Sequence, residues 1–205
     1  MKKLVGLCAL VTGMAFSNAH AVMLQVDATS GILTGATGVN VGGHLYDVAF
    51  MEGTCADVFG VCDPSHFTFT TNTSASVAAQ ALLDQVLIDS ALGLFDSTPG
   101  LTLGCDPLAT ACNMITPFEL TTSNSNPVVG GSFAQNHFNE EGDFPHYGQL
   151  GVSDDSSLNT GLTWAVWSAS TVDVPEPGTL MLLGAGLFSL AATRGRKRST
   201  RQLTD

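Results

Sequence analysis

The densest group of side chains that could bind a ligand lies between residues 137 and 146. Two imidazoles and three carboxylates occur there, and they belong to His137, Glu140, Glu141, Asp143 and His146. Carboxylates are preferred ligands of Ca²⁺, whereas imidazoles suit Zn²⁺ or Cu²⁺. The stretch lacks the regular oxygen ligands and the sixth-position glycine of an EF-hand loop. We therefore expect a solvated acidic loop without a cofactor, and a Ca²⁺ site is the alternative.

The sequence contains no recognisable arrangement of catalytic residues. Glu140 and Glu141 are adjacent, so on a strand they would point to opposite faces and could not flank a glycosidic bond together. Ser132 follows two glycines but lacks the Gly-x-Ser-x-Gly context of a nucleophile elbow. We therefore expect a non-catalytic protein with no catalytic residues, and a secreted hydrolase is the alternative.

Two further sets of side chains could bind a sugar or a surface. Four aromatic residues could stack on sugar rings, although alternating aromatics in strands are more often core residues: Tyr46, Tyr147, Trp164 and Trp167. Three threonines could form a flat strand face suited to ice: Thr68, Thr70 and Thr71. A carbohydrate-binding or ice-binding module is therefore a third candidate.

Four of the five cysteines form two pairs with the same spacing, Cys55 with Cys62 and Cys105 with Cys112. Four cysteines allow three connectivities, of which we favour the two local pairs. An Asp-Pro dipeptide beside each pair favours a turn. A straight helix would hold residues seven apart at about 10 Å, beyond the roughly 7 Å limit for a disulfide. Zinc binding is the alternative, but the pairs lack the usual ligand spacing.

The charge distribution excludes several classes of partner. Every Lys and Arg lies at residues 2–3 or 194–201, and residues 22–174 contain none. Of the 18 acidic residues, all except Glu176 and Asp205 lie in that middle stretch, which leaves 16 there. Binding to nucleic acid requires cations that neutralise phosphates, so we expect no nucleic-acid partner. The same absence argues against P-loop nucleotide sites.

Short strands separated by Gly, Asn and Ser clusters dominate the expected secondary structure. Alternating or β-branched patterns predict strands at residues 24–26, 31–34, 45–50, 66–71, 118–121 and 162–168. Residues 123–160 are rich in Gly, Asn, Ser and Asp, and we expect long loops there.

Residues 74–92 instead show an apolar rhythm of about 3.6 residues, with Val77, Ala81 and Leu82 among its apolar positions. This predicts one amphipathic helix with Ser74 or Ser76 as its N-cap and Gly93 as its stop. The predicted fold class is mainly β, a β-rich α+β domain with an antiparallel sheet or sandwich and one amphipathic helix.

The N-terminus has the three-part pattern of a secretory signal peptide. Lys2 and Lys3 precede an uncharged, mainly apolar run, and Ala19 and Ala21 fit the small-residue rule for cleavage. We therefore expect a signal helix within residues 1–21, cleavage by signal peptidase, and an exported domain over residues 22–173.

The C-terminus has the pattern of a membrane anchor. Residues 178–193 are uncharged and end at a basic cluster made of Arg194, Arg196, Lys197 and Arg198. As a helix they would span about 24 Å, a little less than the roughly 30 Å hydrocarbon core. The positive-inside rule then predicts a single membrane-spanning helix with a cytoplasmic tail at residues 199–205.

A proline-rich motif stands just before this apolar run: Val174, Pro175, Glu176, Pro177 and Gly178. Two prolines fix φ and remove two amide donors, so the peptide stays extended and accessible. A linker before a permanent membrane anchor is the alternative interpretation.

Together, the motif, the apolar run and the basic cluster at residues 174–198 resemble the PEP-CTERM sorting signal of exported Gram-negative bacterial proteins. The resemblance implies recognition by an exosortase, a membrane enzyme with a cysteine nucleophile, and removal of the tail near the motif. It implies export through the inner membrane, transient anchoring, and a final location at the cell surface or outside the cell. Exopolysaccharide of a biofilm matrix is the partner that it suggests. The same tail is sometimes named an ice-binding protein C-terminal domain, which says nothing about the exported domain.

Overall fold

The computed structural model of the chain describes residues 21–139 and 142–171, which belong to the unit Ala21–Val172. Its strands are β1 (Met23–Val26), β2 (Leu33–Val41), β3 (His44–Met51), β4 (Asp89–Ser90), β5 (Gly93–Leu94), β6 (Ala111–Ser123), β7 (Asn126–His137), β8 (Phe144–Gly151) and β9 (Leu162–Ala169). Its α-helices are α1 (Cys55–Phe59) and α2 (Asn72–Gln85), and single 3₁₀ turns cover Pro64–His66, Pro99–Leu101 and Ser156–Leu158. The described domain is therefore mainly β, as the sequence predicts.

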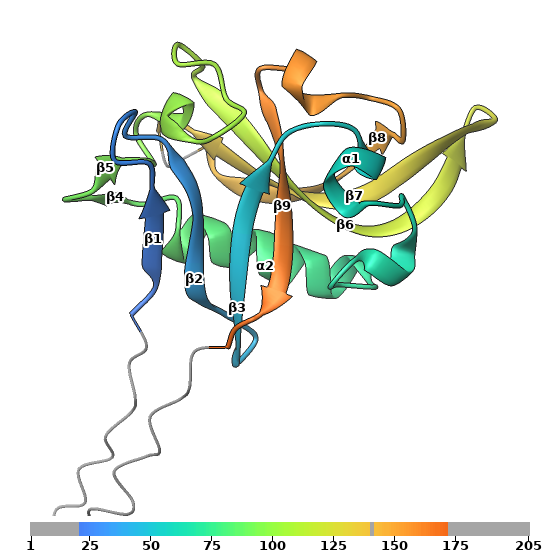
Figure 1. Cartoon of the computed structure of the whole chain (residues 1–205), viewed down its shortest axis with the longest axis horizontal. Coiled ribbons are helices and arrows are strands. Elements are labelled where there is room, and N and C mark those ends of the chain that lie inside the picture. The colour runs from blue at the N-terminus through green and yellow to red at the C-terminus, as the bar shows by residue number, and fades with distance from the viewer. Residues whose placement is uncertain (1–20, 140–141, 172–205) are drawn as a thin grey trace, which may run out of the picture. The chain divides into compact units, whose positions relative to one another are not determined.

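Seven of these strands form one sheet in the order β1-β2-β3-β9-β6-β7-β8 (Figure 1). Two antiparallel meanders, β1-β2-β3 and β6-β7-β8, are joined by the last strand, β9, which lies between them. β9 pairs antiparallel with β3 but parallel with β6, over Asn113–Ile115 and Leu162–Trp164. The sheet is therefore mixed, where the sequence predicted an antiparallel one. β4 and β5 form a separate two-stranded hairpin.

Helix α2 lies across one face of the sheet and contacts β2, β6, β7 and β8 (Figure 1). Its buried face consists largely of alanines, including Ala75, Ala78 and Ala79, which are fully buried. Such small side chains allow the helix backbone to approach the sheet closely, and the larger core side chains there come from the strands. Of the predicted apolar positions, Ala81 and Leu82 are buried as expected, whereas Val77 is 43% exposed.

The bounds of α2 also differ from the prediction of residues 74–92. The N-cap is Thr71, whose hydroxyl accepts the Ser74 amide at 3.2 Å. The helix ends seven residues early because the Val86 and Leu87 amides both donate to the Leu82 carbonyl, at 2.9 and 2.8 Å. This turn buries Val86 and Leu87 in the core.

The second face of the sheet carries a smaller core, formed by Ile115, Phe133, Trp164 and their neighbours beneath the α1 segment. The predicted strand at residues 66–71 leads into this region but is not a strand. Phe67 and Phe69 are buried while the intervening threonine is exposed, so the alternation was interpreted correctly. The segment stays outside the sheet, and the Thr68 hydroxyl donates to the Trp167 carbonyl.

The predicted loops at residues 123–160 were also wrong, because most of this region is strand. β6 and β7 form a long hairpin whose turn residues, Asn124 and Ser125, both have positive φ values of 50° and 68°. Such turns match the twist of the flanking strands. β8 then completes the meander at the sheet edge.

The chain enters and leaves this domain at one end of the sheet, where β1 begins and β9 ends (Figure 1). The predicted signal helix, apart from Ala21, and the predicted membrane-spanning helix at residues 178–193 lie outside the described residues. Within the described ranges, no helix has the length and apolarity to cross a bilayer.

Candidate functional site

The acidic stretch predicted as a cation site lies at the end of β7 and the start of β8. Glu140 and Glu141 lie outside the described residues. The Asp143 carboxylate accepts the backbone amide of His137 at 2.6 Å, and the His137 ring nitrogen Nδ1 lies 2.5 Å from Asn139 Oδ1. The hydrogen bond between His137 and Asp143 therefore joins the end of β7 to the residue that precedes β8.

His146 lies apart from these contacts, packed between aromatic rings. Its imidazole stacks on Phe133 at 5.4 Å between ring centres with an interplanar angle of 23°, and it also contacts Phe144. Across residues 21–139 and 142–171, no group of three His, Cys, Asp or Glu side chains is placed to hold a metal ion. The described members of the predicted set therefore do not form a metal centre by themselves.

The proposed sugar-stacking aromatics are mostly core residues. Trp164 and Trp167 are buried, and their indole nitrogens donate to the Gly53 carbonyl and the Thr116 hydroxyl, each at 3.0 Å. Tyr46 is half-buried, whereas Tyr147 is 47% exposed on β8. Tyr147 is therefore the one member of the set with a largely open ring.

The proposed flat threonine face is not present in residues 67–71. That segment has no sheet pairing. Thr68 is used by its hydrogen bond to the sheet, and Thr71 caps α2. The geometry that ice recognition by a threonine strand would require is therefore not found there.

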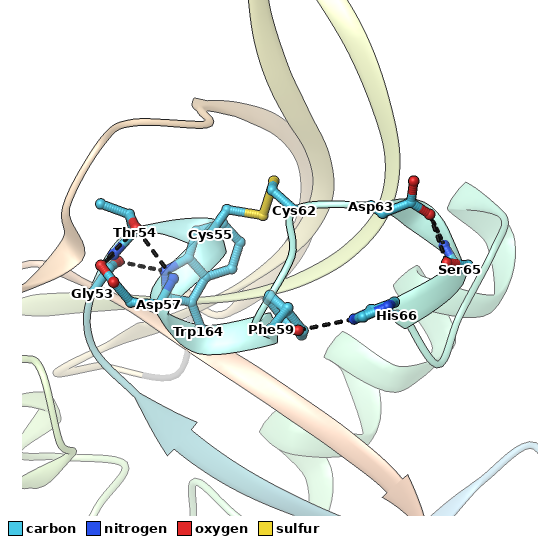
Figure 2. Close-up of a disulfide and its surroundings, with 10 residues drawn as sticks. All are labelled: Gly53, Thr54, Cys55, Asp57, Phe59, Cys62, Asp63, Ser65, His66 and Trp164. Atoms are coloured by element: carbon cyan, nitrogen blue, oxygen red, sulfur yellow. Dashed lines mark hydrogen bonds between the residues drawn. A yellow bond between two sulfur atoms is a disulfide. The ribbon is translucent and has the colours of Figure 1, made fainter.

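Both favoured disulfides are present in the structure. Cys55–Cys62 and Cys105–Cys112 have Cα separations of 5.3 and 5.9 Å. Figure 2 shows the first bond, which ties the start of α1 to the loop that follows it, beside Trp164. The second bond ties β6 to the loop that precedes it. Each disulfide therefore pins a short local loop against the sheet.

The Cys55–Cys62 loop is further fixed by capping (Figure 2). The Thr54 hydroxyl and the Asp57 carboxylate form a reciprocal capping box at the start of α1. Hydrogen bonds from the side chain and backbone of Thr54 lower the pKa of Asp57 below its ordinary value. After the loop, Asp63 caps a 3₁₀ turn, and His66 Nδ1 lies 2.9 Å from the Phe59 carbonyl oxygen.

A groove that the sequence analysis missed lies between α2 and strands β7 and β8. Its volume is about 510 Å³, and its lining includes Ser76, Gln80, Ser132 and Tyr147. Polar residues on one face of a helix are typical of a solvated surface, and so they gave no signal. Two residues of this lining, Tyr147 and His146, were singled out by the sequence, but as parts of different sites: Tyr147 as a sugar-stacking ring and His146 as a cation ligand.

The sheet and its two local disulfides define a disulfide-bonded, β-rich domain, a class that persists in oxidising compartments outside the cytoplasm. The family model of the PEP-CTERM protein-sorting motif matches residues 173–197, and this confirms the sorting signal predicted there. The motif supports an exosortase-targeted, exported protein, and it implies export across the inner membrane and a membrane-anchored sorting tail. No curated protein and no solved structure matches the chain.

The matched segment contains the whole predicted processing motif, Val174–Gly178, and most of the basic cluster that follows the apolar run. These residues, like the signal-cleavage residue Ala19, lie outside the described residues. Removal of the tail near this motif is therefore a prediction from the sequence.

Proposed function

We propose that this protein is a non-catalytic component of the cell surface or extracellular matrix of a Gram-negative bacterium, where it associates with exopolysaccharide. Signal peptidase and an exosortase would process its two ends. The observation that carries the proposal is the sorting-motif match at residues 173–197, directly after a disulfide-bonded domain.

The charge of the exported region supports a matrix role. Residues 22–174 carry 16 acidic side chains and no Lys or Arg. Such a surface favours solubility and repels anionic lipid, so the released domain would not adhere to the membrane that it has just crossed. Divalent cations could bridge it to acidic groups of the matrix.

The experiment is a test of processing in an exosortase-containing host. The Pro175→Ala/Pro177→Ala variant allows the motif to form regular structure, so it should no longer be cut as an extended peptide. The full-length protein should therefore stay in the membrane fraction. Wild type should be recovered outside the membrane with a mass that lacks both terminal segments. Pro107→Ala, in a loop of the domain, is the matched control and should be processed normally. An unchanged mature mass in the double variant would refute the proposed processing.

Association with exopolysaccharide is tested separately by fractionation. In a strain that cannot synthesise the polymer, processed protein should shift from the cell-associated matrix into the soluble medium. If the distribution is the same in both strains, the matrix role fails while the sorting role stands.

A further inference from the structure

The groove between α2 and the β7–β8 edge has the chemistry of a site for an uncharged polar ligand. It is lined by amides and hydroxyls, such as those of Asn72, Ser76 and Gln80, and its lining contains no Asp, Glu, Lys or Arg. His146 is the one imidazole in this lining, and in a domain with so many carboxylates a groove of about 510 Å³ without an acidic side chain is a distinct local environment.

Ser132 gives this groove a polar group without a partner. The residue is 1% exposed, and its hydroxyl oxygen is buried with no hydrogen-bond partner. Ser132 pairs directly with Tyr147 across β7 and β8, so both side chains lie on the same face of the sheet. A buried hydroxyl without a partner is unfavourable, and a hydrogen bond to a ligand hydroxyl would satisfy it.

Two partly exposed apolar side chains form part of the groove lining. Val77 on α2 is 43% exposed and Tyr147 on β8 is 47% exposed. The Tyr147 hydroxyl accepts a hydrogen bond from Gln149 at 2.7 Å and donates to Glu119 at 3.3 Å, which holds the ring in place. A held aromatic ring beside amides and hydroxyls suits a sugar ring, which has apolar C–H faces and polar edges.

A second groove lies on the other side of Val77. It has a volume of about 400 Å³ and is lined by residues that include Tyr46, Thr68, Phe69 and Ser74. Val77 contributes to the lining of both grooves, so they adjoin at this side chain of α2. Two adjoining grooves suit linked sugar units better than a single one.

We propose that these two grooves form a binding site for a neutral polysaccharide chain. This inference rests on the proposed matrix function and names the class of polymer. An acidic polymer is disfavoured because residues 22–174 offer no Lys or Arg to neutralise it. Uncharged sugars match the hydroxyls and amides of the lining and avoid this repulsion.

The test is calorimetric titration of the full chain in a detergent without a sugar head group. The probes are cellohexaose, maltohexaose and chitohexaose, with hexagalacturonate as the anionic comparison. At least one neutral probe should bind, and hexagalacturonate should not. Tyr147→Ala should weaken binding about tenfold, whereas Tyr147→Phe keeps the ring and should weaken it about threefold or less.

Ser132→Ala separates ligand binding from folding. Because the hydroxyl has no partner in the domain, its removal should leave the melting temperature unchanged or raise it. Affinity for the neutral probe should nevertheless fall about fivefold, as expected for one lost hydrogen bond. Leu158→Ala, at an 84% exposed position in another part of the described domain, is the control and should bind as wild type does.

Three outcomes would overturn the proposal: no neutral probe binds at millimolar concentration, hexagalacturonate binds more tightly, or Tyr147→Ala and Ser132→Ala both bind as wild type. Because the titration uses the unprocessed chain, its result does not depend on exosortase cleavage. A failure of the glycan site is therefore distinguishable from a failure of the proposed processing.

Discussion

At the scale of single residues, several carboxylates are used as local hydrogen-bond acceptors. Residues 22–174 contain no Lys or Arg, so no such side chain can pair with these acids there. Asp27, Asp57, Asp63 and Asp89 accept hydrogen bonds from nearby serines or threonines, and in each case these bonds lower the pKa of the carboxyl group. The acids thus organise turns and helix starts in place of ion pairs.

Asp89 gives a testable case at this scale. The Ser97 hydroxyl, followed by the backbone amides of Ser97 and Asp96, lowers the pKa of Asp89. A lowered folded-state pKa means that the contribution to stability is complete above the ordinary value of 3.8 and is lost as pH falls through the folded value. We expect Asp89→Ala to lower the melting temperature by about 2–4 °C at neutral pH.

The pH series supplies the check on this prediction. The difference between Asp89→Ala and wild type should shrink as the pH is lowered below 3.8 and the carboxyl becomes protonated. Asp84→Ala, on the exposed side of α2, is the control and should show a smaller difference at neutral pH. If Asp89→Ala destabilises the domain equally at neutral and at acidic pH, the charged form of the Asp89 carboxyl does not have this stabilising role.

Residue types alone predicted the cysteine pairs and the sorting motif, because both are local patterns with a fixed spacing. They did not predict the groove, because its residues come from α2 and β7–β8, which are far apart in the sequence. Ser132 became a binding candidate only when the structure showed that its hydroxyl is buried without a partner. A property of this kind depends on the packing around a residue and has no signature in the sequence.

At the scale of elements, glycines explain why β7 and β8 were mistaken for loops. A Cβ atom at Gly131 would lie 2.5 Å from Ile115 Cγ1, and one at Gly148 would lie 2.5 Å from Phe133 Cε2. Large side chains from the neighbouring strand therefore fill the space above these positions. The strands carry too few side chains of their own to show a usual strand pattern. Residues 45–50 alternate and residues 162–168 are rich in large apolar side chains, and both were predicted correctly.

This packing predicts the effect of adding one methyl group. Gly131→Ala should destabilise the domain by about 1–3 kcal/mol, because Ile115 must move within a filled core. Gly161→Ala is the matched control, since its Cβ would meet no atom closer than 3.9 Å, and it should change stability by less than about 0.5 kcal/mol. Chemical denaturation of both variants measures the difference, and equal stabilities would show that Ile115 yields without cost.

At the scale of the whole molecule, removal of the two predicted terminal segments would change the charge of the protein. The complete chain has a formal charge of −11, and all seven basic residues lie in the two terminal segments predicted to be removed or kept in the cytoplasm. The region between them carries only acids and neutral histidines at neutral pH. The exported domain must therefore be held together by its two hydrophobic cores, its hydrogen bonds and its disulfides against the mutual repulsion of its carboxylates.

This repulsion predicts an unusual response to salt. Raising the ionic strength from about 0.01 to 0.1 M shortens the screening length from about 30 to 10 Å. Because residues 22–174 contain no Lys or Arg, screening removes repulsion without weakening compensating ion pairs, so the melting temperature of the processed protein should rise by a few degrees. The rise should be smaller near pH 3, where many carboxyls are protonated.

Thermal unfolding in NaCl measures the effect, and CaCl₂ at the same ionic strength separates screening from cation binding. A fall in melting temperature with NaCl would mean that attractive charge pairs, rather than repulsion, dominate the folded domain.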